Sequence, residues 1–340
     1  NFVIVKDNEF MKVLVTGAAG FVGSSLSAVL AKQGHEVFGV DNFSDYYSPD
    51  LKRARVENLL QPHHVEFKKV DLLDEKSLNS VFASFEPDCC IHLAAQPGVR
   101  VPRSDYSKYF ESNLTAFSSI LLSIERFKVK NFMFASTSSV YGDGAALPYK
   151  ESEVNLNPKS FYGGTKLSNE ILAKSFFANS RTKFRALRLF TVYGPWGRPD
   201  MAYLKLINSS LSGSTFTLFG DGSLKRDFTY IDDTTIAITK LMVELNLRVE
   251  GFGDVVNVGG GKPETMSDLI SIVHELTSKE PNIVQLAPLD VDPLETCADH
   301  TYLDSLVGQI PSTSLRNGIQ QCIQWASRPE ISHELSAWLT

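Results

Sequence analysis

Six short apolar runs, often rich in β-branched residues, alternate with helical stretches through the first half of the chain, and this alternation limits the possible folds more than any other feature. The runs cover residues 12–17, 35–41, 65–71, 88–95, 131–137 and 184–190. Helical patterns fit between them, notably over residues 21–33, 107–127 and 161–178. Strands that alternate with helices and are apolar nearly throughout predict an α/β fold, a parallel sheet with helices on both faces.

The pattern loosens after about residue 190, where Gly and Pro become frequent, as in "YGPWGRPD" (193–200) and "VGGGKP" (258–263). We therefore expect a first domain over residues 11–190 and a smaller α/β domain over 191–340, with the chain crossing back once. A ligand site is expected in the cleft between them. Residues 1–10 precede Met11, and we assign them to neither domain.

The composition excludes several classes of partner. A formal net charge of −6 over 340 residues argues against a nucleic-acid partner, which requires a basic patch. No apolar run approaches the ~18 residues of a membrane span, and the first residues do not resemble a signal peptide. The four cysteines (89, 90, 297 and 322) contain no C-x-x-C motif, so we expect neither a disulfide framework nor a metal site, and a reducing cytoplasmic location.

A glycine-rich turn, "TGAAGFVG" (16–23), follows the first strand and opens the first helix. Gly17, Gly20 and Gly23 permit a tight turn and a close approach of the backbone to a pyrophosphate. The helix N-terminus offers unpaired N–H groups to the phosphates. The strand–turn–helix context therefore predicts a dinucleotide site.

Asp41 ends the second strand, at about the expected ~20 residues after the turn. A carboxylate there can bind ribose hydroxyls and repel a 2′-phosphate, so we expect NAD and not NADP. The nearby cations Lys52, Arg53 and Arg55 could favour a 2′-phosphate instead. A solvated helix face is the interpretation we favour for these three residues.

Tyr162 and Lys166 lie four residues apart in "SFYGGTK" (160–166), so on a helix they share one face. Hydroxyls from Ser136 to Ser139 end the fifth strand, at the sheet edge where ligands bind in such folds. This set fits hydride transfer at a secondary alcohol, with Tyr162 as base. The charges of Lys166 and of an oxidised nicotinamide should depress the phenol pKa from ~10. Gly163 and Gly164 either permit close approach of a ligand or partner helix or have no special role.

Together these residues resemble the extended short-chain dehydrogenase/reductase family, over nearly the whole chain from Met11. The resemblance rests on "TGAAGFVG", Asp41, "DLLD" (71–74), "HLAAQ" (92–96), "STSSVYG", "YGGTK", "GPWGRPDM" (194–201) and "GDGSLKRDFTYIDD" (220–233). It implies a doubly wound Rossmann domain and a small substrate domain that binds a nucleotide-sugar. "VDNFSDYYSPDLKRAR", "AAQPGVR" and "GPWGRPDMA" are most similar to UDP-glucuronate 4-epimerases, which use NAD to oxidise carbon 4 and return the hydride to the other face of the sugar.

The resemblance also implies roles for individual residues. Tyr162 would be the base, Lys166 its activator and Thr137 the hydroxyl partner. The cofactor would meet Gly17, Gly20, Phe21, Val22, Gly23, Asp41, Asn42, Asp71, Leu72, Ala94, Ala95, Gln96, Asn113, Tyr162 and Lys166. The UDP-sugar would meet Arg100, Thr137, Ser138, Ser139, Tyr162, Thr191, Arg198 and Arg226. For Arg198 the alternative is a salt bridge within its loop. A homodimer is implied through the helices at 107–127 and 161–178.

The residues after Thr137 separate the possible reactions. Related dehydratases and decarboxylases carry carboxylates there for further acid/base steps, whereas this chain has Ser138 and Ser139. Hydroxyls favour plain oxidation and reduction, hence epimerisation. The alternatives are another UDP-sugar (UDP-glucose/galactose or an N-acetylhexosamine), a decarboxylase or dehydrogenase, and a non-catalytic NAD-binding protein, which the intact Thr137, Tyr162 and Lys166 disfavour.

Three departures from the subgroup's pattern bear mainly on the choice of sugar. Val101-Pro102 stand where Tyr-Ser is expected, and "LDVD" (289–292) replaces "PGDV". The second change places two acidic residues near the expected nucleotide pocket. Gly164 stands where the family helix has Ala.

Overall fold

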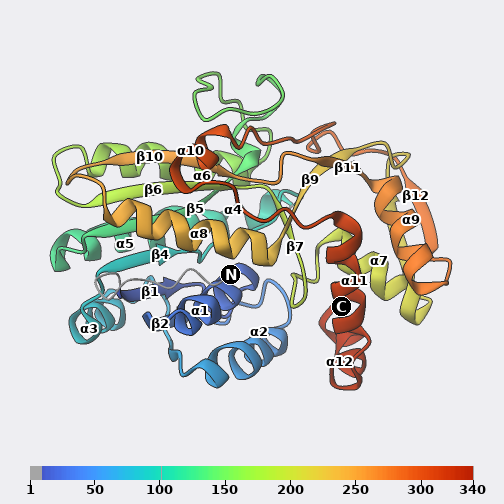
Figure 1. The fold of residues 1–340 in the computed structure, drawn as a ribbon, viewed down its shortest axis with the longest axis horizontal. Helices are drawn as coiled ribbons and strands as arrows, with labels where there is room; N and C mark the ends of the chain where they lie inside the picture. Colours follow the sequence, from blue (N-terminus) through green and yellow to red (C-terminus); the bar gives the residue numbers. More distant parts are fainter. Residues whose placement is uncertain (1–9, 101, 340) are drawn as a thin grey trace.

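The computed structural model describes residues 10–100 and 102–339, and its main feature is a seven-stranded parallel sheet (Figure 1). The predicted doubly wound parallel fold is confirmed. Strand order is β10-β6-β5-β4-β1-β2-β3, and it reverses between β1 and β4. Ligands bind beside such a reversal in open α/β sheets. The strands are β1 Lys12–Thr16, β2 Glu36–Asp41, β3 Glu66–Lys69, β4 Cys89–His92, β5 Asn131–Thr137, β6 Lys183–Leu189 and β10 Gly253–Val258.

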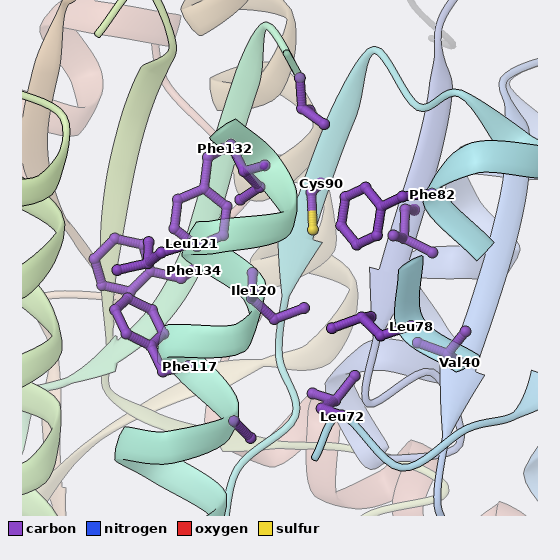
Figure 2. Packing of buried hydrophobic residues seen from close by; sticks show 14 of the residues in the cluster. Val40, Leu72, Leu78, Phe82, Cys90, Phe117, Ile120, Leu121, Phe132 and Phe134 are labelled. Carbon is purple, nitrogen blue, oxygen red and sulfur yellow. The ribbon is translucent and has the colours of Figure 1, made fainter. Parts of the chain in front are cut away.

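Helices cover both faces of this sheet because successive strand residues point to opposite sides. Phe132 and Phe134 of β5 pack against Phe117 of α5 (Ala116–Phe127), and residues of α3 (Glu75–Phe85) belong to the same core (Figure 2). Met133, between them, belongs to the opposite core. That core contains residues of α1 (Phe21–Lys32), α8 (Ile231–Asn246) and α10 (Thr301–Val307). Both faces of the strands are therefore buried, which explains their nearly continuous apolar sequence.

The helix expected over residues 107–127 is not a single α-helix. It begins with a 3₁₀ turn (Arg103–Asp105) and a short α4 (Tyr106–Tyr109), and a π-helical segment (Phe110–Thr115) precedes α5. Asn113 lies in the π-helical segment and is 1% exposed. Its Oδ1 accepts from the Gln96 backbone N–H at 2.7 Å, and its Nδ2 donates to Thr165 Oγ1 at 3.1 Å. Single π turns are frequent at functional sites.

The second half of the chain forms a smaller lobe and also returns to the large sheet through β10 and its flanking helices α8 and α10. A three-stranded sheet joins β7 (Thr191–Tyr193), β9 (Lys225–Tyr230) and β11 (Pro263–Thr265). A second, two-stranded sheet pairs β8 (Thr215–Phe219) with β12 (Asn282–Leu286). The helices of this lobe are α7 Ala202–Ser212, α9 Met266–Thr277, α11 Leu315–Ala326 and α12 Pro329–Leu339. No helix within the described residues is long and apolar enough to cross a membrane.

Candidate active site

A cavity of about 1280 Å³ lies at the carboxyl ends of the large sheet's central strands and extends to the smaller lobe. Every site residue expected from the sequence lines it except Asn113. Asn113 is buried behind the wall, where it holds the backbone of Gln96, and Gln96 itself lines the cavity. The strands and loops that sequence analysis selected therefore converge on one space.

The glycine turn is packed so closely that side chains would not fit. Gly17 has a φ of +71°, and a Cβ there would lie 2.6 Å from the Ala94 nitrogen. A Cβ on Gly23 would lie 2.1 Å from the Gly17 carbonyl oxygen. Helix α1 begins at Phe21 with no side-chain cap, so its first N–H groups remain available to a ligand. This cradle fits a dinucleotide pyrophosphate.

Asp41 anchors the next part of the cavity wall. Its carboxylate accepts from the backbone N–H groups of Ala19 at 3.2 Å and Phe43 at 2.8 Å. Asn42 donates to Asp71 at 3.2 Å, so the ends of β2 and β3 are linked. Acceptor oxygens grouped in this way suit ribose hydroxyls.

The interpretation of Lys52, Arg53 and Arg55 as a solvated face is wrong for two of the three. They lie on α2 (Pro49–Arg55), and only Arg53 is exposed. Lys52 is 5% exposed, lines the cavity and donates to Ser44 Oγ at 2.9 Å. Burial lowers the pKa of Lys52, while the Asp41 carboxylate opposes that shift. Arg55 is completely buried.

Helix α6 (Phe161–Phe176) carries the expected acid/base pair. Ser160 caps it by accepting from the Gly163 N–H at 3.0 Å, and Tyr162 and Lys166 follow one turn apart on the cavity wall. A Cβ on Gly163 would lie 2.8 Å from the Ser139 carbonyl oxygen, whereas one on Gly164 would meet nothing within 4 Å. Gly163 therefore permits α6 to approach the turn after β5, and Gly164 has no such role.

The pKa of Tyr162 is raised in the protein alone. Burial raises it above its usual value, and the charge of Arg198 and a hydrogen bond with Thr137 only partly oppose the rise. The predicted depression of this pKa requires the charge of an oxidised nicotinamide as well as that of Lys166, so it stays a prediction for the loaded site. Lys166 is 1% exposed, and burial lowers its pKa to about 8. The lysine thus remains mostly charged at neutral pH.

The strand-end hydroxyls lie beside the tyrosine. Thr137 Oγ1 donates to Ser139 Oγ at 3.2 Å and accepts from the Ser139 N–H at 3.2 Å. Ser138 and Ser139 line the cavity and start a 3₁₀ turn (Ser138–Val140). This part of the wall therefore presents hydroxyls and no carboxylate.

Arginines occupy another part of the cavity wall. Arg198 forms the loop salt bridge considered as its alternative, with two hydrogen bonds to Asp200 at 3.0 and 2.8 Å, and it lines the cavity as well. Arg100 and Arg226 both form ion pairs with Asp292, with N···O distances of 2.5 and 3.8 Å. Asp292 belongs to the "LDVD" departure and lines the cavity. Val101, from the other departure, lies outside the described residues.

Several residues of the cavity wall carry no signal of a ligand site in the sequence. Tyr46 donates to Asp200 at 3.5 Å across a large sequence separation, and nothing in the local sequence signals that contact. Asp200 stands two residues after Arg198, a spacing that could have suggested the pair. Lys52 and Asp292 also line the cavity, and their sequence context alone does not indicate a ligand role.

The fold and the cavity define a dinucleotide-dependent enzyme of oxidation–reduction chemistry, with a tyrosine–lysine pair on the cavity wall. Residues 13–259 match the family described as "NAD dependent epimerase/dehydratase family", and the chain belongs to it. The predicted family and its cofactor, NAD, are thereby confirmed.

Individual relatives extend the comparison. UDP-glucuronate 4-epimerase 4 of Arabidopsis thaliana is 36% identical over 338 residues, covering 94% of this chain and 76% of that protein. The crystal structure of UDP-glucuronic acid 4-epimerase from Bacillus cereus, in complex with UDP-glucuronic acid and NAD, is 35% identical with a TM-score of 0.84 and covers 93% of this chain and 98% of its own. The crystal structure of UDP-glucose 4-epimerase from Thermotoga maritima is 29% identical with a TM-score of 0.83. It covers 93% of this chain and 98% of its own.

Proposed function

We propose that this protein is an NAD-dependent UDP-glucuronate 4-epimerase, which interconverts UDP-glucuronate and UDP-galacturonate through a transient 4-keto sugar. One observation carries the proposal. Thr137, Tyr162 and Lys166 meet on the wall of the cavity, and the two residues that follow Thr137 are serines and not carboxylates. The relatives above that act on UDP-glucuronate support the choice of sugar.

Tyr162 is the proposed general base and acid at the O4 hydroxyl. NAD, when bound, supplies the hydride acceptor and donor. Lys166 is mostly protonated at neutral pH because its pKa is about 8, and this charge favours the phenolate form of Tyr162. Thr137 contributes a hydroxyl that can hydrogen-bond the same sugar oxygen. The elevated pKa of Tyr162 in the protein alone means that further positive charge has to lower it when the site is loaded.

The cofactor is assigned to the wall around the glycine turn and Asp41. The glycine cradle at Gly17 and Gly23 fits the pyrophosphate, since a Cβ at either position would collide with backbone. Phe21 and Val22 open α1, and Asn42, Asp71 and Leu72 follow β2 and β3. Ala94, Ala95 and Gln96 follow β4, where Asn113 fixes the backbone of Gln96.

The UDP-sugar is assigned to the other side of the cavity. Ser138 and Ser139 can hydrogen-bond the uronate carboxylate but are poor acids and bases. This matters because a 4-keto uronate is a β-keto acid that loses carbon dioxide readily. Arg100 and Arg226 are assigned to the diphosphate, with Thr191 and Arg198 near the sugar. Both diphosphate arginines already contact a carboxylate, Asp292, within the cavity.

The assembly and domain assignments belong to the same proposal. Residues 11–190 would bind NAD, and 191–340 would mainly bind the nucleotide-sugar, apart from the segment that returns to the large sheet. A homodimer would form through α5 and α6, which expose Leu122, Ile171, Leu172 and Phe176. A cytoplasmic location stays a prediction from sequence.

Proton NMR of the purified protein with UDP-glucuronate tests the proposal. We expect UDP-galacturonate to appear without release of carbon dioxide and without NADH absorbance. Turnover of UDP-glucose or UDP-N-acetylglucosamine but not of UDP-glucuronate would keep the chemistry and contradict the sugar. Net NADH or carbon dioxide would indicate a dehydrogenase or decarboxylase.

A further inference from the structure

Two loops on the cavity wall, distant in sequence, meet at one buried arginine. The first is the glycine turn at residues 17–20, and the second is the loop at residues 194–200, which carries Arg198. Arg55, at the end of α2, lies between them with 0% exposure. Its Nη1 donates to the Ala19 carbonyl oxygen at 3.2 Å. Its Nε and Nη2 donate to the carbonyl oxygens of Trp196 and Gly197, both at 2.9 Å.

No carboxylate balances this charge within the part of the chain that the structure describes. The fourth hydrogen bond goes to Tyr47 Oη at 2.6 Å, and the Tyr47 ring lies 5.3 Å from the guanidinium carbon. A buried charge is costly unless it is well hydrogen-bonded, and an ion pair is the usual solution. Arg55 instead uses four of its five N–H groups on neutral oxygens. Only the planar fork of arginine can reach both loops at once.

The loop that Arg55 holds has an unfavourable backbone conformation. Trp196 has a φ of +63°, which bulky residues rarely adopt unless the surroundings enforce it. Its carbonyl oxygen accepts a hydrogen bond from Arg55. The centroid of its ring lies 5.4 Å from that of Trp325 and 6.2 Å from that of Trp338. Two residues further on, Arg198 lines the cavity and its charge acts on Tyr162. Loosening this loop would therefore displace the cation, Arg198, that lies near Tyr162.

We propose that Arg55 is a positioning residue that couples occupation of the dinucleotide site to binding of the nucleotide-sugar. The inference rests on the proposed function, because it assigns those two ligands to the two sides of the cavity. A ligand that fixes the glycine turn also fixes Arg55, and through it the loop at 194–200. Coupling of this kind is reciprocal, so each ligand raises the affinity for the other by the same factor.

Isothermal titration of UDP into the full chain, with and without saturating NAD, measures this factor. In the wild type we expect NAD to tighten UDP binding at least about 5-fold. Arg55→Lys keeps the charge but loses the planar guanidinium. In this variant the ratio of the UDP dissociation constants without and with NAD should fall towards 1. Arg53→Lys is the matched control, since Arg53 lies exposed on the same helix and pairs with Asp50, and its ratio should equal that of the wild type. A merely structural role would lower the melting temperature of Arg55→Lys and leave the ratio unchanged.

Tryptophan emission gives a second measurement that does not depend on UDP. All three tryptophans of the chain lie in the cluster around Trp196. ADP-ribose, which fits the dinucleotide side and lacks the nicotinamide ring, should shift the emission of the wild type and of Arg53→Lys but not that of Arg55→Lys. If Arg55→Lys fails to fold, Tyr47→Phe removes one contact of Arg55 and should lower the UDP ratio part of the way.

The outcomes separate this inference from the proposed function. A ratio near 1 in the wild type, or an unchanged ratio in Arg55→Lys and Tyr47→Phe, would overturn the coupling while leaving the epimerase proposal intact. A wild type that binds NAD but no UDP would overturn the proposed function and this inference with it. A ratio that collapses only in the Arg55 and Tyr47 variants, together with loss of the emission shift in Arg55→Lys, would establish the coupling.

Discussion

Arg188 holds Glu170 through two hydrogen bonds of 3.0 and 2.8 Å, and neither side chain is more than 6% exposed. Glu170 also accepts from Ser136 Oγ at 2.5 Å. Glu170 follows Lys166 by one turn of α6, while Ser136 precedes Thr137 on β5. The ion pair therefore fixes the helix that carries Tyr162 and Lys166 to β6, and the hydrogen bond from Ser136 fixes the same helix to β5, the strand that carries Thr137.

Replacing Glu170 with Gln should destabilise the fold by about 3–5 kcal/mol, because Arg188 would keep a buried charge without its partner. Urea unfolding of both proteins measures the difference in free energy of unfolding. Lys130→Ala breaks the exposed pair with Asp88 and should change that free energy by less than about 1 kcal/mol. A similar small change in Glu170→Gln would contradict the role of this pair.

Gly163 and Gly164 should respond in opposite ways to alanine. Gly163→Ala forces a Cβ towards the Ser139 carbonyl oxygen, so α6 must shift and turnover should fall with stability. Gly164→Ala meets open space in a helix and should stabilise the protein by about 0.5–1 kcal/mol. Thermal unfolding and initial rates of the two variants test the contrast. Equal effects at both positions would show that the close contact at Gly163 is unimportant.

Tyr162→Phe should lower turnover by about 10²–10⁴-fold, the usual loss when a general acid/base is removed. NAD binding should persist, since the glycine turn and Asp41 are untouched. Tyr106→Phe is a matched control outside the cavity lining, because Tyr106 stacks on Phe161 at 4.0 Å between ring centroids and needs no hydroxyl for that contact. Turnover that survives in Tyr162→Phe would mean that another group is the base.

His92 should make the protein less stable at mildly acidic pH. Burial, helped by the charge of Lys166, lowers the pKa of His92 to about 3 in the folded state, below the unfolded value of ~6.5. The unfolded chain therefore binds a proton first as pH falls, and stability declines between pH ~6.5 and ~3 by at most about 1.4 kcal/mol per unit.

His92→Gln isolates this contribution. Its loss of stability between pH 7 and pH 5 should be smaller than that of the wild type by about 2 kcal/mol. Urea unfolding at both pH values gives the comparison. An identical pH dependence in the two proteins would show that His92 titrates normally in the folded state.

The exposed apolar side chains of α5 and α6 predict how the proposed dimer can be broken. Ile171 is 61% exposed, and Ile171→Asp places a charge in the proposed interface, so sedimentation velocity should show monomers. Val154 is 85% exposed in a loop outside both helices, and Val154→Asp should leave the mass unchanged. A wild type that sediments as a monomer would rule out this assembly.

Most of the large sheet could be predicted from sequence because its signals are local. The run at 131–137 coincides with β5, and the glycine turn falls between β1 and α1 as expected. Buried parallel strands are apolar throughout, and the turn requires glycine at fixed positions, so both features can be seen without tertiary information. The hydroxyls after β5 and the Tyr162–Lys166 spacing are also local.

Contacts between distant segments could not be predicted. Lys52 and Arg55 look like surface cations in the sequence, but the packing of α2 against the glycine turn and the loop at 194–200 buries Arg55. Asn113, in the π-helical segment, donates hydrogen bonds to Gln96 and Thr165, and a helical periodicity does not reveal these contacts. The raised pKa of Tyr162 follows from burial, which depends on the whole cavity.

The most direct test of the account follows the hydrogen on carbon 4 of the sugar. The protein would be supplied with UDP-glucuronate deuterated at that carbon, and the product examined by NMR and mass spectrometry. Transient oxidation with return of the same hydride predicts UDP-galacturonate that retains the deuterium at carbon 4, with no net NADH. Loss of the deuterium to solvent, or its accumulation in released NADH, would contradict the proposed mechanism.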